Sequence, residues 1–432
     1  MRRLTLVLAC CVWPLAPGAA QQRALTLAEA IQLAVKADPS VVQAEGTSRT
    51  AGASVRSTWG EFLPRINSSA SYGKTYSGLP SHVDPVTGQV ISGSITSGSL
   101  SFGGNASIDI FTGFRRGADL SAARANVSDA DASLADLRAQ SALKTSNQFI
   151  QTLQSADLVR QQQDAIRRAE DKLAIANAKL ATRAATIADS LGAVVDVARA
   201  RAALLTQQRS LTEAEATLAR LVGMDGRVSA VPDSSLFTIT PISDTAALMG
   251  EALSRSPTVL RAEARVRAQR ASVGIYRSAY WPAVTLSGNA TLNGSSTDSY
   301  NLNSTRGFSF GVSWPLFNGF LRERNLVQAN ANLDAAVATA ADTRHGIAAS
   351  LTTQLAALGI AEQRIVLTAQ SLDAARANAR VQTERYRLGS IGIVELNQAL
   401  DALSAAEQDA INARYEYLRA KAQIEAILGR KL

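Results

Sequence analysis

The sequence has 432 residues, of which 46% are hydrophobic and 19% are charged, and its net charge is +8. This hydrophobic fraction excludes a disordered chain. The mean hydropathy is only +0.01, and no run of about 18 apolar residues follows the N-terminus, so we expect no transmembrane helix. Acidic residues are interleaved with the arginines, which is typical of solvated helix faces and argues against nucleic-acid binding.

The first twenty residues have the pattern of a secretory signal peptide. Arg2 and Arg3 supply the positive end, Leu4–Leu15 is largely apolar, and Gly18-Ala19-Ala20 is a small-residue cleavage site. We therefore predict a signal peptide over residues 1–20 and export of the rest of the chain.

Both cysteines, Cys10 and Cys11, fall inside this segment. A chain cut after Ala20 has no thiol, which excludes disulfides and thiolate metal sites. Lipid attachment at Cys10 is the alternative processing route, although the apolar run before Cys10 is short for it.

The remainder of the chain repeats itself, and a repeat indicates a structural unit that cannot bury its apolar face alone. One set of matches lies 218 residues apart and a second set 206 residues apart, so the first copy has the longer hairpin insertion. The pairs are Pro39 with Pro257 and Pro64 with Pro282 at the first offset, and Phe111 with Phe317 and Gly223 with Gly429 at the second.

These matches predict a first repeat over residues 21–223, an irregular linker over residues 224–244 and a second repeat over residues 245–432. Each repeat reads as a helix, a β-hairpin and a long helical hairpin. The opening helices are predicted over residues 26–59 and 246–279, with a proline near each start, where it is best tolerated.

The hairpin segments alternate between apolar and polar residues, the pattern of strands with one face of each kind. In the second copy, Phe308, Phe310 and Val312 alternate with glycine and serine, and Leu100 and Phe102 do the same in the first copy. Strands of about ten residues or more are long enough to cross a bilayer when tilted. Residues 77–93 and 293–304 are the predicted loops.

Long helices follow each hairpin. The segment from Ala118 to Leu180 would span roughly 95 Å as a helix, and Arg183–Thr186 is the predicted tip before a shorter return helix. Alanine and leucine recur every seven residues, the spacing of coiled-coil contacts, although an ordinary helical bundle shares that spacing. The series are Leu326, Leu333, Ala340 and Ile347; Leu396, Leu403, Ala410, Tyr417 and Ile424; and Ala399, Ala406, Ala413, Ala420 and Ile427.

Four strands cannot close a membrane barrel, and open strand edges cannot face lipid. The chain must therefore combine its strands with those of copies of itself. Two copies give about eight strands and a filled barrel, whereas three give about twelve with room for a lumen. A purely structural periplasmic coiled-coil protein is the competing hypothesis, but it does not explain the alternating strands.

Catalysis is not expected. Neither His82 nor His345 belongs to a cluster of cysteine, histidine or carboxylate residues at ligand spacing, so no metal site is predicted. No Gly-x-Ser-x-Gly elbow or phosphate-binding glycine loop stands in its required context. We predict no enzyme activity and no cofactor.

Three motifs resemble the TolC-like outer-membrane efflux protein family: Leu25–Ala30 followed by Asp38-Pro39, the strand entry Phe62-Leu63-Pro64, and Tyr386–Ser390 leading to Ala413–Leu418. The resemblance implies a mixed α+β membrane protein. It implies a homotrimer with a twelve-stranded β-barrel in outer-membrane lipid and a long α-helical coiled-coil tunnel in the periplasm. It also implies an exit duct that docks with a periplasmic adaptor and an inner-membrane transporter. A channel for type I protein secretion shares this build and stays an alternative.

The family's adaptors dock at the helical tips, which the resemblance carries to Arg387, Leu388, Gly389, Ser390 and Ile391, and to Ala181, Thr182, Arg183, Ala184 and Ala185. Arg183 stands where the second tip has Gly389, which leaves the geometry of the first turn open. The family's periplasmic aperture carries over to Glu395 and Gln398, with Asp189 as the first-repeat equivalent of Glu395. Three copies of Glu395 would form a negative ring; the alternative is an ordinary surface residue.

Overall fold

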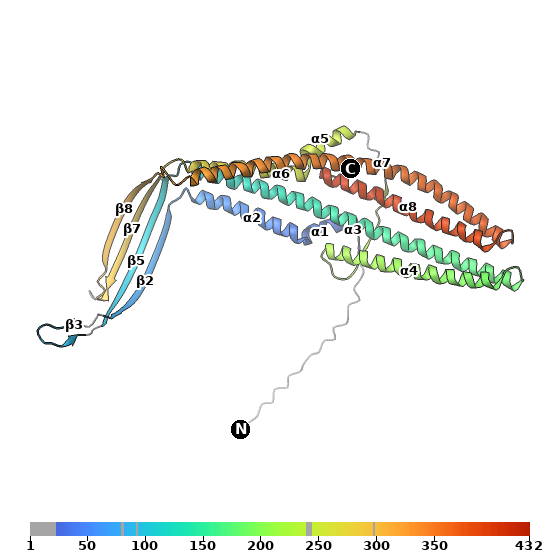
Figure 1. Ribbon diagram of the computed structural model, residues 1–432, viewed down its shortest axis with the longest axis horizontal. Helices are drawn as coiled ribbons and strands as arrows, with labels where there is room; N and C mark the ends of the chain where they lie inside the picture. The colour runs from blue at the N-terminus through green and yellow to red at the C-terminus, as the bar shows by residue number, and fades with distance from the viewer. Residues whose placement is uncertain (1–22, 79–81, 92–93, 239–243, 297–298) are drawn as a thin grey trace, which may run out of the picture. The chain divides into compact units, whose positions relative to one another are not determined.

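The structure is a computed structural model that describes residues 23–78, 82–91, 94–238, 244–296 and 299–432 (Figure 1). The predicted signal peptide with Cys10 and Cys11, and parts of the two predicted hairpin loops, lie outside the described residues. Within the described residues, no helix is both long and apolar enough to cross a membrane.

The two halves of the sequence contain the same main elements in the same order. The first half has α1 (Leu27–Ala37), α2 (Pro39–Gly60), β2 (Arg65–Gly78), β5 (Ser94–Phe111), α3 (Arg115–Ala181) and α4 (Ile187–Leu221). The second half has α5 (Thr245–Arg255), α6 (Pro257–Ser278), β7 (Ala283–Ser295), β8 (Asn303–Ser313), α7 (Leu321–Arg387) and α8 (Ile393–Leu428). The shorter elements are β1 (Arg23–Leu25), β3 (His82–Val83), β4 (Val90–Ile91), β6 (Val228–Ala230) and a 3-10 turn (Ser234–Phe237).

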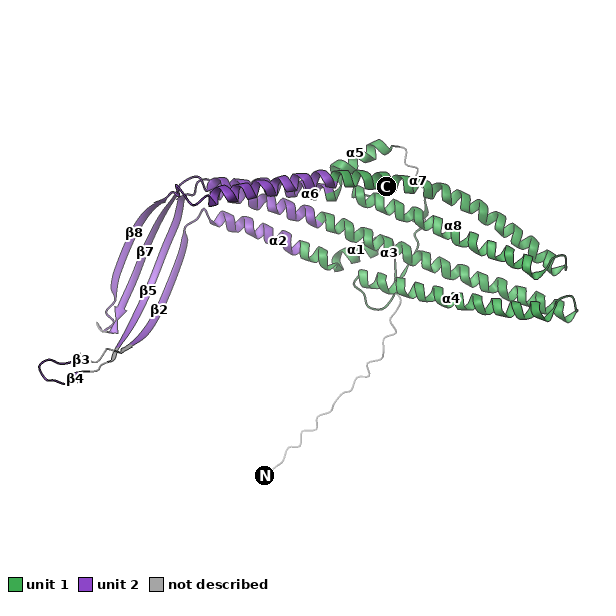
Figure 2. Cartoon of the chain, viewed as in Figure 1, with its two compact units in different colours: residues 1–44, 135–258, 344–432 green, residues 45–134, 259–343 purple. Residues whose placement is uncertain are grey.

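The compact units of the chain do not coincide with the repeats. One unit comprises residues 1–44, 135–258 and 344–432, and the other comprises residues 45–134 and 259–343 (Figure 2). Each unit therefore takes segments from both halves, as expected if neither repeat buries its apolar surface alone.

Each predicted opening helix is in fact two helices, so the prediction of single helices over residues 26–59 and 246–279 is wrong. α1 ends at an extended Asp38, with φ −68° and ψ 117°, and Pro39 is the first residue of α2. Ser256 and Pro257 repeat this break between α5 and α6. The reason is steric, because a proline ring pushes the preceding residue out of the helical region.

The linker over residues 224–244 is less irregular than expected. Its strand β6 pairs in parallel with β1, so that Arg23 is opposite Val228 and Leu25 is opposite Ala230. Leu25 and Val228 are almost fully buried in the same apolar core. The linker therefore fixes the start of the described chain to the first unit.

The four long strands form one antiparallel sheet in the order β2-β5-β7-β8. The pairing of β5 with β7 joins the two halves, with a register shift between Asp109 and Phe111. The register confirms the predicted alternation, because residues of like character share a face from strand to strand. One row of the apolar face is Ile66, Ala106, Gly288 and Phe308, and one row of the polar face is Asn67, Asn105, Asn289 and Gly307.

Each strand pair is fixed to the following helix by an arginine. In the first copy, Arg116 donates to the Ile110 carbonyl at 3.1 Å and lies 4.9 Å from the centre of the Phe62 ring. In the second copy, Arg322 donates to the Leu316 carbonyl at 3.3 Å and lies 4.7 Å from the centre of the Tyr280 ring. The partners of Arg322 are thus the repeat equivalents of the partners of Arg116.

The heptad series of α8 is confirmed. Ala399, Ala406, Ala413, Ala420 and Ile427 are all buried, as are Leu396, Leu403, Tyr417 and Ile424, while Ala410 is half-buried. The series in α7 differs, because Leu326, Leu333, Ala340 and Ile347 are only half-buried. The chain by itself therefore covers the heptad face of α8 but not that of α7.

The two Phe-x-Gly-Phe turns offer a matched test of the strand-to-helix junction. Gly113 and Gly319 both have positive φ, of +62° and +64°. A Cβ at Gly113 would lie 2.6 Å from the Trp281 Cβ and 2.7 Å from the Ser278 carbonyl oxygen, whereas one at Gly319 meets nothing within 4 Å. Gly319→Ala should cost about 1 kcal/mol from backbone strain alone, and Gly113→Ala should cost more. Thermal unfolding of both purified variants checks this, and equal losses would contradict the packing described for Gly113.

Candidate functional site

The two helical tips have the same turn geometry, although one has arginine where the other has glycine. At the first tip the amides of Arg183 and Ala184 donate to the carbonyls of Leu180 and Lys179 at 3.0 and 2.8 Å. The corresponding amides of Gly389 and Ser390 donate at 3.1 and 2.8 Å. This pair of bonds is the Schellman motif that ends many helices. The first turn therefore has the same geometry as the second, although Arg183 replaces glycine.

Arg183 adopts this turn at a cost. Its φ is +61°, and that of Gly389 is +80°. A left-handed conformation costs a residue with a Cβ about 1–2 kcal/mol, and glycine much less. The first tip therefore stores backbone strain that the second tip does not.

The helices after the tips begin differently, and this separates Asp189 from Glu395. Thr186 caps α4: its hydroxyl and amide donate to Asp189 Oδ2 at 2.8 and 2.9 Å, and the Asp189 amide donates to the Thr186 hydroxyl at 3.2 Å. These bonds from Thr186 hold the pKa of Asp189 below its usual value, with a smaller contribution from Lys179. The Asp189 carboxylate is therefore engaged in the cap of α4.

The Glu395 carboxylate makes no capping bond of this kind. The residue at the cap of α8 is Gly392, which has no hydroxyl and makes no side-chain capping bond. Glu395 and Gln398 are both exposed on the first turns of α8. Within the described residues Glu395 makes no side-chain hydrogen bond or ion pair, so its carboxylate is open to solvent at the positive end of a helix.

Lys179 joins the two tips. Its ammonium group donates to the Tyr386 carbonyl at 2.8 Å and lies 4.1 Å from the centre of the Tyr386 ring. Tyr386 is 2% exposed, and its hydroxyl has no hydrogen-bond partner within the described residues. Burial raises the pKa of this phenol, and the Asp189 carboxylate adds to the increase. The structure thus brings Asp189 and both tips together.

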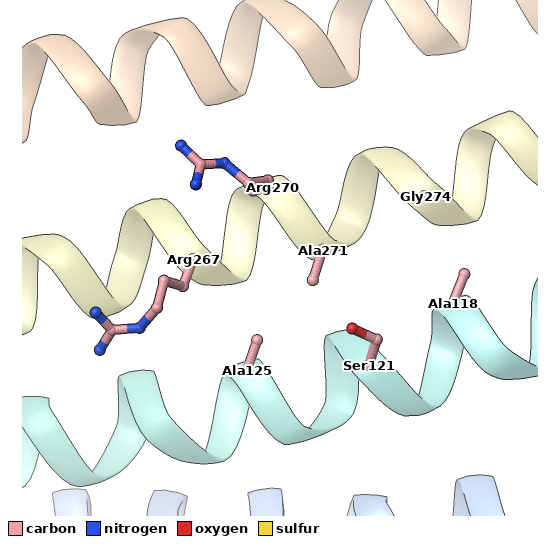
Figure 3. A pocket seen from close by; sticks show the side chains of 7 residues that line it. All are labelled: Ala118, Ser121, Ala125, Arg267, Arg270, Ala271 and Gly274. Atoms are coloured by element: carbon pink, nitrogen blue, oxygen red, sulfur yellow. The ribbon is translucent and has the colours of Figure 1, made fainter.

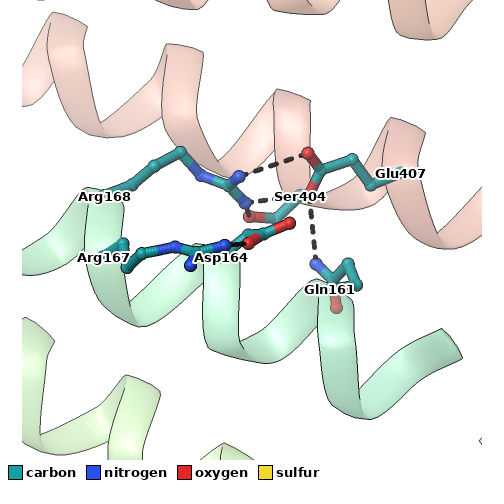
Figure 4. A network of polar contacts seen from close by, with 6 residues as sticks. All are labelled: Gln161, Asp164, Arg167, Arg168, Ser404 and Glu407. Carbon is teal, nitrogen blue, oxygen red and sulfur yellow. Dashed lines mark hydrogen bonds and ion pairs between the residues drawn. The ribbon is translucent and has the colours of Figure 1, made fainter. Parts of the chain in front are cut away.

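Polar contacts continue along the helices above the tips. The Lys172 ammonium group, 6% exposed, lies 2.5 Å from Asp196 Oδ2 on α4 and 2.7 Å from Asn397 Oδ1 on α8. One helical turn away, Arg168 donates to both carboxylate oxygens of Glu407 at 2.8 and 3.2 Å (Figure 4). We call these contacts of α3 with α4 and α8, together with the contact of Lys179 with α7, the polar ladder.

The polar ladder extends well beyond these two pairs. Gln154 donates to Asn412 at 2.8 Å, and Arg419 donates to Gln151 at 2.7 Å. The buried Tyr415 donates to Asp157 at 2.6 Å, and burial together with this carboxylate raises the pKa of the Tyr415 phenol. From Gln151 to Lys179 the ladder follows about 42 Å of α3.

The sequence predictions did not include the ladder, although a signal was present. Gln154, Gln161 and Arg168 recur every seven residues, as do Lys172 and Lys179. Polar residues at coiled-coil spacing set helix register and partner choice. Sequence reasoning used the heptads of alanine and leucine and missed the polar ones.

The second unit has a groove between α3 and α6. Arg267 and Arg270 of α6 stand at its edge, and small residues such as Ala118 and Ala125 of α3 line it (Figure 3). A Cβ at Gly274 would lie 3.5 Å from that of Ala118, which is an ordinary van der Waals contact, so the helices approach closely here without requiring glycine. The groove has no carboxylate or histidine beside its one hydroxyl, that of Ser121, so its small residues serve helix packing.

No group of three or more histidine, cysteine or acidic side chains in the described residues is arranged to hold a metal ion.

An amphipathic sheet joined to paired helical hairpins in a duplicated chain defines the class of fold. The sequence profile of the outer membrane efflux protein family matches residues 30–224 and 248–430. This chain belongs to that family, which confirms the resemblance drawn from its motifs.

Curated relatives support the same family. The outer membrane protein OprJ of Pseudomonas aeruginosa is 31% identical over 145 residues, 33% of this chain and 30% of OprJ. The outer membrane protein TolC of Vibrio cholerae is 24% identical over 261 residues, 55% of this chain and 58% of TolC. The toluene efflux pump outer membrane protein TtgI of Pseudomonas putida is 23% identical over 241 residues, 55% of this chain and 50% of TtgI. This chain thus spans from under a third to just over half of the length of these relatives.

Solved structures confirm the fold over nearly the whole chain. CusC is 18% identical with a TM-score of 0.79, and the alignment covers 94% of this chain and 92% of CusC. The outer membrane protein VceC of Vibrio cholerae is 21% identical with a TM-score of 0.75, covering 94% of this chain and 96% of VceC. The predicted α+β fold is therefore confirmed.

The polar ladder gives a testable difference between buried and exposed ion pairs. Lys172→Met keeps the apolar stem but leaves Asp196 without its buried partner, and should destabilise the protein by about 2 kcal/mol. Arg201→Met is the matched control, because Arg201 also joins α3 to α4, through Glu170, but these side chains are 65% and 46% exposed. That control should change stability by less than about 0.5 kcal/mol. The measurement is thermal unfolding, and similar losses for the two variants would contradict the role given to Lys172.

Proposed function

We propose that this chain is a subunit of a trimeric outer-membrane channel that serves as the exit duct of a tripartite efflux pump. The observation that carries the proposal is the four-stranded sheet, which has one apolar and one polar face. Within the described residues its outer strands, β2 and β8, are paired on one side only. Such a sheet is suited to lipid on one face and water on the other.

Closure into a ring would satisfy the edges of β2 and β8, since each unpaired backbone group in lipid costs several kcal/mol. Three copies would supply twelve strands. The polar face, composed mostly of serine, threonine, asparagine and glycine, would then line a lumen that eight strands leave no room for.

The helices support the same assembly. In the part of the chain that the structure describes, α4 exposes Ile187, Leu191 and Leu205 at 61–68% of their surface, and the heptad face of α7 is only half-buried. Apolar surface of this kind marks a contact with another chain. We assign it to neighbouring copies in a tunnel of helices on the periplasmic side of the membrane.

We assign both tips to a periplasmic adaptor, which would connect the duct to an inner-membrane transporter. Ala181–Ala185 and Arg387–Ile391 are largely exposed. A strained conformation is retained where something compensates for it, and the strain at Arg183 is explained if its guanidinium contacts the adaptor. The duct itself has no catalytic step and needs no cofactor in this proposal.

The leader would be removed after Ala20, so that Cys10 carries no lipid. The mass of the mature N-terminal peptide tests this assignment. A lipid-modified cysteine at the mature N-terminus would replace signal-peptide cleavage with lipoprotein processing.

Deletion of the gene separates efflux from protein secretion. Under our proposal, the deletion strain becomes more sensitive to small toxic compounds, and the wild-type gene restores resistance. Loss of a single secreted protein with unchanged sensitivity would assign the channel to type I secretion instead.

Arg183→Gly tests the first tip. Relief of the left-handed strain should stabilise the protein by about 1 kcal/mol, while weakening adaptor binding and resistance. Gly389→Ala is the control that adds strain at the other tip, where a Cβ would meet nothing within 4 Å. Gain of stability with unchanged adaptor binding would remove Arg183 from the docking surface.

Glu395→Ala tests the aperture. Three Glu395 carboxylates in one ring would attract divalent cations that block the current, so the variant should lose cation block in single-channel recordings. Gln398→Ala should have a smaller effect because it removes no charge, and Asp189→Asn should act on the α4 cap. If cation block in Glu395→Ala equals that of the wild type, Glu395 is an ordinary surface residue.

A further inference from the structure

We propose that the lipid-facing surface between neighbouring copies binds the phosphate of an outer-leaflet lipid, through Lys74 of one copy and Arg306 of the next. This inference rests on the ring closure proposed above. It adds a binding site that the transport role does not require.

The first step is the charge on the two faces of the sheet. Lys74 and Arg306 both lie on the apolar face, in register with residues such as Gly98 and Ala290. The charged residues of the polar face, Arg65 and Asp109, include a carboxylate. The apolar face has none within the described strands, so both of its cations lack a counter-charge there.

The second step is the level of these cations in the membrane. Trp314 lies next to the helical end of β8, and Arg306 is eight residues further out. At about 3.4 Å per residue and a tilt of about 40°, that separation is about 21 Å along the membrane normal. The apolar band of such sheets is about 25 Å tall. Arg306 therefore lies at the outer edge of the band.

Aromatic residues mark the same outer edge on β2. Tyr72 and Tyr76 are exposed on either side of Lys74, whose ammonium group lies 5.4 Å from the centre of the Tyr76 ring. Tyr300 packs over Gly98, the residue opposite Lys74, so closely that a Cβ at Gly98 would overlap the Tyr300 hydroxyl. Tyrosines in this arrangement are typical of the level of lipid headgroups.

The third step is the stagger of the strands, which brings the two cations together. The row through Arg65 on β2 meets Ser309 on β8, although β8 continues four residues to Ser313. These four residues arise in the step from β2 to β5, because Arg65 pairs with Ser107 although β5 continues to Phe111.

The step from β8 to the neighbouring β2 is the repeat equivalent of the step from β5 to β7, in which Leu100 faces Gly294. At the 206 and 218 offsets these two positions correspond to Arg306 and Tyr76.

Facing residues of paired strands share a side of the sheet. The position opposite Arg306 is therefore Tyr76 of the next copy, and Lys74 is its diagonal neighbour on the same face. This register places the Lys74 ammonium group within reach of the Arg306 guanidinium. Two neighbouring cations beside apolar side chains are destabilising unless an anion lies between them.

A lipid phosphate has the chemistry that this position needs. The guanidinium fork and the ammonium group both donate charge-assisted hydrogen bonds to phosphate oxygens. The acyl chains of the same lipid would cover Phe308, Phe310 and Val312, which are 63–89% exposed in the chain. The occupant is therefore a phosphorylated lipid of the outer leaflet.

The test measures lipid retention by the full-length protein purified from outer membranes in mild detergent. The probe is diphosphoryl lipid A, scored by native mass spectrometry of the assembly, with dephosphorylated lipid A and phosphatidylglycerol as comparison lipids. Wild-type protein should retain the diphosphorylated lipid in preference to both. Lys74→Gln with Arg306→Gln should weaken retention about thirtyfold, the equivalent of about 2 kcal/mol.

Two controls accompany this comparison. Lys36→Gln with Arg56→Gln removes the same charge from exposed positions on α1 and α2 and should leave retention unchanged. The exchanged pair Lys74→Arg with Arg306→Lys keeps both charges and should restore retention.

The possible results distinguish failure of the lipid site from failure of the proposed trimer. Trimers in which the double variant retains lipid like the wild type would overturn the site while leaving the channel intact. Equal retention of phosphorylated and dephosphorylated lipid by the wild type would overturn it as well, even if the double variant fails to assemble. A chain that stays monomeric would instead overturn the ring closure.

Discussion

The backbone groups on the outer sides of β2 and β8 have no strand partner within the described residues. In water these groups would be solvated, but in lipid each would cost several kcal/mol. The proposed ring removes this cost, because the edges of the sheet would meet the edges of other copies. The register within the chain, the stagger of its rows and the half-buried heptads of α7 are all consistent with such a ring.

The two repeats share one architecture, and the few residues that differ between them change the local structure. Arg116 and Arg322 make equivalent contacts in the two repeats, so the junction between strand and helix is common to both copies. The tips share a turn but differ in strain, because Arg183 occupies a conformation that Gly389 adopts freely. The following helices differ in capping, since Thr186 engages Asp189 whereas Gly392 leaves Glu395 unbound. One scaffold thereby has two chemically different tips.

Much of this fold could be predicted from the sequence, because its signals are periodic. A hydrophobic period of two residues identified the faces of the sheet, and a period of seven residues identified the buried alanines of α8. The helix breaks before Pro39 and Pro257 were not predicted, because the helical pattern on both sides outweighed the steric effect of proline on the preceding residue. The polar residues of α3 also recur every seven residues, but that spacing does not identify partners such as Asp196 and Asn397, which meet Lys172 only after the helices pack.

The strand stagger was also beyond the sequence. Hydrophobic alternation assigns Lys74 and Arg306 to the apolar face, but it cannot say which rows they occupy. Pairing through β5 and β7 fixes those rows, and this explains why two isolated cations became a candidate site only with the sheet register known.

The most direct test of ring closure is disulfide formation between β8 and the neighbouring β2. The mature chain is expected to have no cysteine, so Ser313→Cys can be combined with Ser69→Cys, or Ser309→Cys with Gly73→Cys, without background. We predict disulfide-linked species that stop at three chains for at least one combination. Ser287→Cys with Ser309→Cys is the control within one chain, because these hydroxyls lie 2.6 Å apart. Formation of the control disulfide, with no link between chains or with a ladder that ends at another number, would contradict the three-copy ring.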